Sequence, residues 1–334
     1  MLKILRASVL ALAIASVAEA EELSVATFVP PSHETVTGMF AWFGREIEER
    51  SGGTLTMKLY PAGQLGAGPV QQYKRAVEGV ADITFGVAAL TPTLFPKTML
   101  AIPPGKALNA VDSTQRLWRV FDTYMADEWS AVKVLALGNP AGAMLVSTKD
   151  VSTMEGMQGA KIVPFAAMTT PVIQGMGAVP VALPPTDHYT ALSTGTIDAA
   201  VSTINNLLPP WHLDAVADYA IVNTPATFNV TFVVMNLERY QGLSEEHRAI
   251  LDELAGLPMS MELAKSFDHA DNLAIDWVAE QIAAGALKVE WIVASDAERA
   301  KMEAAAAEGM AQIYEEYAAR GIDNAEEIYR ALNQ

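Results

Sequence analysis

The sequence predicts an α/β protein of two similar lobes that are braced by long C-terminal helices. The chain has 334 residues and is 51% hydrophobic, which is more than a single hydrophobic core usually needs. Strand and helix patterns alternate over residues 23–87, and the same alternation returns over residues 161–201. The last third of the chain is dominated by helical patterns, which we expect to pack across both lobes.

The first lobe is predicted to follow a strand–helix–strand–helix–strand order. A strand pattern over residues 23–28 leads into a helix that Ser32 caps, with Glu34 in the first turn and a stop at Gly52-Gly53. The remaining elements are a strand at 55–59, a short helix at 70–77 and a strand at 82–87. This order favours a parallel or mixed sheet that is covered by helices.

The second lobe is predicted from a repetition of this order. Its expected elements are strands at 161–163, 179–183 and 197–201 and helices at 169–176 and 186–194. Gly79–Asp82 and Gly195–Asp198 share the pattern G-x-x-D, and each lies between the end of a helix and an apolar strand. Because the element order is the same on both sides, we interpret the two halves as related lobes.

The C-terminal region is predicted to be mostly helical. Ser244 opens a helix that Pro258 interrupts, and a longer helix continues to about Ile282. Ser295 and Glu298 form a capping box for another long helix. We expect the N-terminal lobe to hold residues 21–145 plus about 229–270, and the C-terminal lobe with the bracing helices to hold residues 146–228 plus about 271–334.

Residues 1–20 have the pattern of a secretory signal peptide. Lys3 and Arg6 precede an uncharged apolar run from Ala7 to Val17, and Ala18-Glu19-Ala20 offers the small residues that a signal peptidase reads. The run is shorter than the ~20 apolar residues of a membrane-spanning helix. We therefore expect cleavage after Ala20 and a periplasmic protein that is not itself embedded in the membrane.

Composition and motifs argue against most kinds of chemistry. The net charge of −17 disfavours nucleic acid and anionic membranes as partners, and the absence of cysteine excludes disulfides, thiolate metal sites and cysteine nucleophiles. None of the five histidines lies at metal-pair spacing, and the chain contains neither a G-x-S-x-G elbow nor a P-loop. We expect no catalytic residue, no metal and no cofactor, and therefore a protein that is not an enzyme.

Two lobes without a catalytic motif predict the capture of a small molecule by hinge closure. Ligands in such folds lie at the carboxyl ends of strands and at helix N-termini. The candidate ligand-binding residues near those ends are Phe28, His33, Ala88, Val163, Phe165, Ser202, Asn205, Trp211 and Phe228. The four larger aromatic rings among them could enclose a ligand, and such rings also suit a cationic one.

Several stretches of the chain closely resemble the DctP-type substrate-binding proteins of TRAP transporters. The matching stretches are Pro30–His33, Tyr60–Gly66, Ala76–Ile83, Met157–Ile162, Gly177–Val181 and Tyr189–Asp198. The last of these, Y-T-A-L-S-T-G-T-I-D, is the most specific. The resemblance implies a periplasmic-binding-protein type II-like fold and a monomeric receptor. Such a receptor captures a small molecule, by default an organic acid, and delivers it to a small and a large membrane subunit.

One departure from the family pattern concerns ligand charge. Members usually carry an arginine in the strand G-x-K-I-R, where it pairs with the ligand carboxylate. In this chain Val163 stands at that position. Ser202 stands at a second position, where the family usually has an asparagine. Either another cation replaces the arginine, or the ligand is a neutral polyol, an amine or a zwitterion. The candidate cations are Lys161, His33, Arg75 and Lys106. Two other roles stay open, namely ligand sensing for a receptor and an exported enzyme on the same scaffold.

Overall fold

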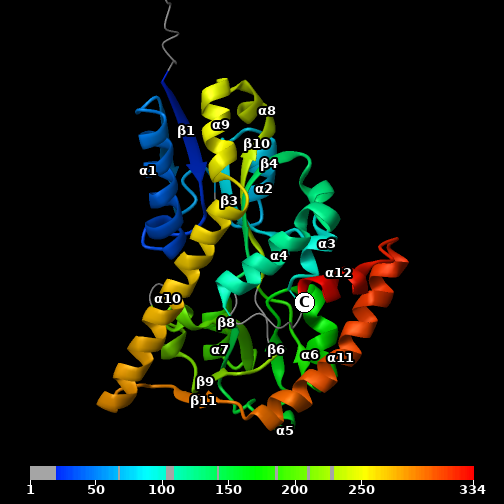
Figure 1. Cartoon of the computed structure of the whole chain (residues 1–334). Coiled ribbons are helices and arrows are strands. Elements are labelled where there is room, and N and C mark those ends of the chain that lie inside the picture. The colour runs from blue at the N-terminus through cyan, green and yellow to red at the C-terminus, as the bar shows by residue number, and fades with distance from the viewer. Residues whose placement is uncertain are drawn as a thin grey trace, which may run out of the picture.

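The computed structural model describes residues 20–66, 68–102, 109–140, 143–184, 187–208, 211–225 and 229–334. Figure 1 shows two α/β lobes, one above the other, each built on its own sheet. The strand order is β2-β1-β3-β10-β4 in the first sheet and β11-β9-β5-β8-β6-β7 in the second. The predicted fold class, two α/β lobes with long C-terminal helices, is confirmed.

The first sheet is formed by β1 (Glu21–Ala26), β2 (Leu55–Tyr60), β3 (Ile83–Val87), β4 (Val132–Gly138) and β10 (Thr231–Asn236). The helices of this lobe are α1 (Ala41–Arg50), α2 (Gln72–Val77), α3 (Pro96–Met99), α4 (Ala110–Tyr124), α8 (Leu237–Gly242) and α9 (Glu245–Leu254). A π-helical turn, η1 (Thr35–Phe40), precedes α1, and Glu34 stands at its N-cap. The helix that we expected to begin at Ser32 therefore starts with this wider turn.

The second sheet is formed by β5 (Ala143–Ser147), β6 (Lys161–Val163), β7 (Val179–Pro180), β8 (Ala199–Thr203), β9 (Tyr219–Val222) and β11 (Glu290–Val293). Its shorter helices are α5 (Met154–Met157), α6 (Thr170–Gly175) and α7 (His188–Ser193). Short 3-10 turns are η2 (Ala88–Leu90), η3 (Ala126–Trp129), η4 (Ala167–Thr169), η6 (Ile204–Leu207) and η7 (Leu213–Ala215).

The two sheets share one topology. The order β2-β1-β3-β10-β4 corresponds to β7-β6-β8-β5-β9, and β11 adds one strand beyond β9. In both sheets the first three strands are parallel, and the fourth runs antiparallel to its two neighbours. This correspondence agrees with the repetition inferred from the sequence.

The G-x-x-D turns perform the same structural task in each lobe. A carboxylate oxygen of Asp82 accepts a hydrogen bond of 2.7 Å from the backbone N–H of Ser24 in β1. Asp198 accepts one of 2.8 Å from the backbone N–H of Lys161 in β6. The glycine that opens each turn has φ +68°, a conformation that only glycine adopts at little cost. The repeated motif is therefore a structural link between parallel strands.

The chain crosses between the sheets after β4, after β9 and again between β10 and β11, and we propose these crossings as the lobe boundaries. The first crossing precedes β5, which begins at Ala143, so it lies slightly before the limit expected at residue 145. The limit expected near residue 270 falls inside the continuous helix α10 (Leu257–Ala284). Pro258 stands in the first turn of this helix, where a proline is tolerated.

Helix α10 joins the two lobes. Its first half buries Met259, Leu263 and Phe267 in the core of the first lobe, and its second half buries Ala274 and Val278 in a core of the second lobe. Figure 1 shows this helix running past both sheets. The long helix α11 (Asp296–Ala319) and α12 (Ala325–Leu332) pack on α6 and α4 respectively, so they also connect the lobes.

No helix within the described residues is long and apolar enough to cross a membrane.

We predict that Asp198→Ala lowers the free energy of unfolding by about 2 kcal/mol, because it removes the partner of a buried backbone N–H. Asp198 is 5% exposed. Burial opposes its ionisation, but Lys149 and the N–H of Lys161 outweigh this effect and lower its pKa. Urea denaturation measures the change. The exposed Asp122 on α4 provides the control, and equal unfolding midpoints for Asp122→Ala and Asp198→Ala would contradict the prediction.

Candidate ligand-binding site

A cavity of about 450 Å³ lies between the two lobes. Its wall combines residues after β1 and β3 of the first lobe with residues after β6 and β8 of the second, and α10 closes one side. Ligand pockets for small molecules typically measure roughly 300–1,000 Å³. The carboxyl ends of strands from both sheets therefore meet at a space that fits a small organic molecule.

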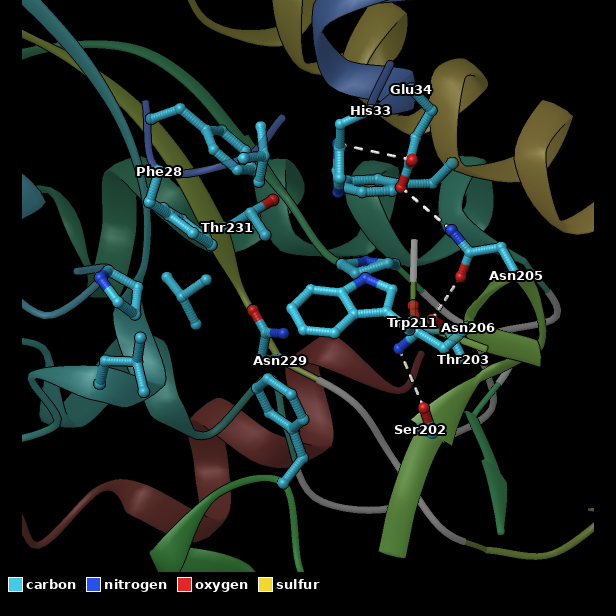
Figure 2. Close-up of a pocket in the computed structure, with 18 of the residues that line it drawn as sticks. Phe28, His33, Glu34, Ser202, Thr203, Asn205, Asn206, Trp211, Asn229 and Thr231 are labelled. Carbon is cyan, nitrogen blue, oxygen red and sulfur yellow. Dashed lines mark hydrogen bonds and ion pairs between the residues drawn. The ribbon is translucent and has the colours of Figure 1, made fainter. Parts of the chain in front are cut away.

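Aromatic rings form much of the cavity wall. Phe28 and Phe85 stack with ring centroids 5.9 Å apart, and the His33 ring lies 6.4 Å from that of Phe85. Phe165 and Trp211 line the cavity from the second lobe. Figure 2 shows side chains from both lobes around this space. Such a wall favours a flat or apolar ligand body, since each ring removes a large apolar area from water on binding.

One end of the cavity carries two carboxyl groups. Glu34, at the N-cap of η1, and Asp271, on α10, both line the wall. The Nδ2 of Asn205 donates a hydrogen bond of 3.2 Å to Oε1 of Glu34, and the backbone N–H of Asn205 donates to Asp271. The Nδ1 of His33 lies 3.4 Å from Oε2 of Glu34 and 2.8 Å from the hydroxyl of Thr35. Asn205 thus links both acids to the second lobe.

Burial shifts the pKa values of Glu34, Asp271 and His33 in the direction that favours the neutral form of each group. Burial raises the pKa of Glu34, and it raises the pKa of Asp271 to about 8 with a further contribution from the nearby charges of Glu34 and Asp268. Burial also lowers the pKa of His33 to about 4, so this imidazole is neutral at pH 7. His33 therefore supplies no positive charge to balance the two acids.

The polar residues after β8 hold one another in place. The Nδ2 of Asn206 donates to the hydroxyl of Ser202 over 2.9 Å, and the hydroxyl of Thr203 donates to Oδ1 of Asn205 over 2.5 Å. Figure 2 marks both bonds. Because these side chains are already paired, the orientation of Asn205 toward Glu34 is fixed before a ligand arrives.

Two buried side chains on the wall keep a polar atom without a partner among the described residues. Asn229 is 1% exposed, and its Oδ1 has no such partner. His188 is neutral, because burial lowers its pKa, and it bonds the backbone of Leu183 while its Nε2 has no partner there. An unpaired polar atom in a buried site is costly, and both of these atoms are closed off from solvent beneath the cavity surface.

The structure brings six of the nine predicted ligand-binding residues to this cavity. They are Phe28, His33, Phe165, Ser202, Asn205 and Trp211. Val163 does not line it, because its side chain packs in a core of the second lobe and is 1% exposed. Ala88 is fully buried beside the wall residues Val87 and Leu90. Phe228 lies outside the described residues.

The sequence contains four candidate cations that could replace the family arginine. Among the described residues of the cavity wall, only the neutral His33 is one of these four. The Nζ of Lys161 donates to the carbonyls of Gly195 and Thr196 at 3.1 Å and is exposed. The guanidinium of Arg75 donates to the carbonyl of Gly68. Lys106 lies outside the described residues. No lysine or arginine occurs among the described residues that line the cavity.

Sequence reasoning did not assign Glu34, Asp271 and Asn229 to the site. Glu34 had the pattern of a first-turn charge that complements a helix dipole. Asp271 lies within a long helical pattern, where a single acid on an inner face gives no distinct signal. The position of Asn229 just before β10 was a usable signal, because it stands at the edge of a strongly apolar strand.

Two related lobes around a cavity that both of them line define a solute-binding protein. The chain belongs to the DctP family, bacterial extracellular solute-binding protein family 7, whose model matches residues 25–317. The family assignment made from the sequence motifs is thus confirmed, and the similar solved structures are TRAP solute-binding proteins.

Several solved structures share the fold over nearly the whole chain. A TRAP solute-binding protein from Rhodoferax ferrireducens T118 in complex with copurified benzoate has a TM-score of 0.84 and 26% identity, over 94% of this chain and 97% of that one. A marine metagenome TRAP solute-binding protein specific for aromatic acid ligands, in complex with 3-hydroxybenzoate, has a TM-score of 0.84 and 24% identity, over 94% of this chain and 97% of that one. A Bordetella bronchiseptica protein with bound mandelate has a TM-score of 0.79 and 24% identity, over 94% and 98%.

A curated relative, uncharacterized protein YiiZ of Salmonella typhimurium, is 25% identical over 166 residues. The match covers 48% of this chain and 50% of the relative, so the chain spans about half the length of that protein.

We predict that the ligand-free protein loses stability as the pH rises from 6.5 to 8. The folded state keeps a proton on Asp271 up to about pH 8, whereas the unfolded chain releases it near pH 3.8, so folding becomes less favourable across this interval. The neutral His33 has the opposite effect, but only below its unfolded pKa of 6.5. The expected loss is on the order of 1 kcal/mol.

Urea midpoints at the two pH values measure this loss. Asp271→Asn should remove most of it, while Asp276→Asn, an exposed acid on the same helix, should keep it. An unchanged pH dependence in Asp271→Asn would contradict the assignment to Asp271.

Proposed function

We propose that this protein is a periplasmic receptor that closes its two lobes around a small organic molecule and delivers it to the membrane subunits of a TRAP transporter. The observation that supports this role most directly is the cavity of about 450 Å³ with residues of both lobes on its wall. A ligand that contacts both walls at once stabilises the closed arrangement over an open one.

The proposed ligand has a flat or apolar body. The rings of Phe28, Phe165 and Trp211 face the cavity from different lobes, and a ring-bearing ligand would bury its faces against them. The solved relative from Rhodoferax ferrireducens, which holds copurified benzoate, supports a ligand of about this size.

The proposal also includes export and partners. The pattern of residues 1–20 supports a signal peptide that is cleaved after Ala20, although residues 1–19 lie outside the described part of the chain. The family and its solved members support a receptor that binds its ligand without converting it. The proposal further includes a monomeric protein and partners that are a small and a large membrane subunit.

We predict that small molecules co-purify with the protein and that adding them back to dialysed protein raises its melting temperature. Mass spectrometry of the extracted molecules identifies them, and a thermal-shift titration measures the affinity. Trp211→Ala should weaken binding about tenfold or more, because it removes a large ring from the wall.

Trp277→Ala provides the control, since Trp277 packs in the second lobe away from the cavity. The proposed function would be rejected if no extracted compound stabilised the protein, or if the protein converted the bound compound into another.

A further inference from the structure

We propose that the ligand carries a protonated amine, which the carboxyl groups of Glu34 and Asp271 bind at one end of the cavity while the aromatic wall holds the rest of the molecule. This inference rests on the proposed function and specifies its ligand class. It depends on the polar atoms that face the cavity and on the charges of the described residues around them.

Two residues that line the cavity each have a buried acceptor atom without a partner among the described residues. The Oδ1 of Asn229 has no partner among the described residues, and Asn229 is 1% exposed and lines the wall. The Nε2 of the neutral His188 is a second acceptor of this kind. The carboxyl groups of Glu34 and Asp271 line the same cavity, and when they are ionised their oxygens match a molecule that donates through N–H groups.

Glu34 and Asp271 differ from the nearby acid Asp268 in their hydrogen-bond partners. Asp268, on the same helix as Asp271, already accepts hydrogen bonds of 2.7 and 3.1 Å from the backbone N–H groups of Ala110 and Val111. Glu34 and Asp271 instead receive hydrogen bonds from Asn205, and their charges repel each other when both groups are ionised. A cation between them would relieve this repulsion and keep both groups ionised.

A carboxylate ligand would have the opposite effect at this end of the cavity. It would bring a third carboxyl group beside Glu34 and Asp271, so at least one of the three would have to keep its proton, and neutral His33 offers no compensating charge. The family arginine that would pair with such a ligand is replaced by Val163, whose side chain packs in a core. The charge balance of the described wall therefore favours a cation over an anion.

The aromatic part of the wall fits the same ligand. Phe28, Phe85 and Trp211 line the same cavity, and the Phe85 ring lies 6.4 Å from the ring of His33. A cation over an aromatic ring is attracted by the negative face of that ring. We therefore expect carboxylates combined with aromatic rings to bind an alkylammonium group more strongly than the uncharged alcohol of the same shape.

Three probes that share a benzene ring but differ in charge test this inference. Isothermal titration calorimetry of dialysed protein near pH 7 compares benzylamine, benzyl alcohol and benzoate. We expect benzylamine to bind most tightly and benzoate most weakly. Glu34→Gln and Asp271→Asn should each weaken benzylamine binding by at least about tenfold, because each removes a charge-assisted hydrogen bond.

Matched controls separate this effect from a general loss of negative charge. Glu49→Gln and Asp276→Asn remove exposed acids outside the cavity and should leave benzylamine affinity unchanged. Melting temperatures of all variants show that they are folded, and benzyl alcohol affinity should change little in Glu34→Gln and Asp271→Asn.

Two results would overturn the amine assignment while leaving the proposed function intact. The first is benzoate binding as tightly as benzylamine, or more tightly. The second is benzylamine binding that is absent, or that Glu34→Gln and Asp271→Asn do not weaken. The mass-spectrometry and thermal-shift experiment on co-purified molecules tests the proposed function separately, because its outcome does not depend on how these three probes bind.

Discussion

The continuous helix α10 is the constraint on which the arrangement of this protein depends. Its first half is buried in one lobe and its second half in the other, so the lobes cannot separate without bending the helix or exposing one of those faces. Phe267, at the end of the first buried half, and Asp271, between the two halves, both line the cavity. The element that holds the lobes together thus also carries part of the binding site.

The position of Glu34 follows from packing on the same helix. The π-helical turn η1 begins directly after Glu34 and lies against α10. A Cβ atom at Gly38 would collide with the side chain of Ser266, so glycine permits this close approach. Turns of this kind often occur at functional sites, because they redirect side chains locally. Here the turn places Glu34 opposite Asn205 of the other lobe.

Sequence patterns predicted the elements with clear periodicity and several of the residues near strand ends that line the cavity. The strand at 55–59, the capping box at Ser295 and the return of the first-lobe order in the second lobe all have counterparts in the structure. Strand β10 was not assigned, because all six of its residues are buried and no alternation marks it. Glu34 and Asp271 were not assigned to the site, since only tertiary packing brings a helix cap and a mid-helix acid together.

The pKa of Asp271, followed by carboxyl ¹³C NMR with and without benzylamine, tests the central claim most directly. The account predicts a pKa of about 8 in the empty protein, because the carboxyl is buried beside Glu34 and Asp268. It also predicts a fall toward the ordinary value when the ammonium group binds. An ordinary pKa in the empty protein, or a pKa that benzylamine leaves unchanged or raises, would contradict it.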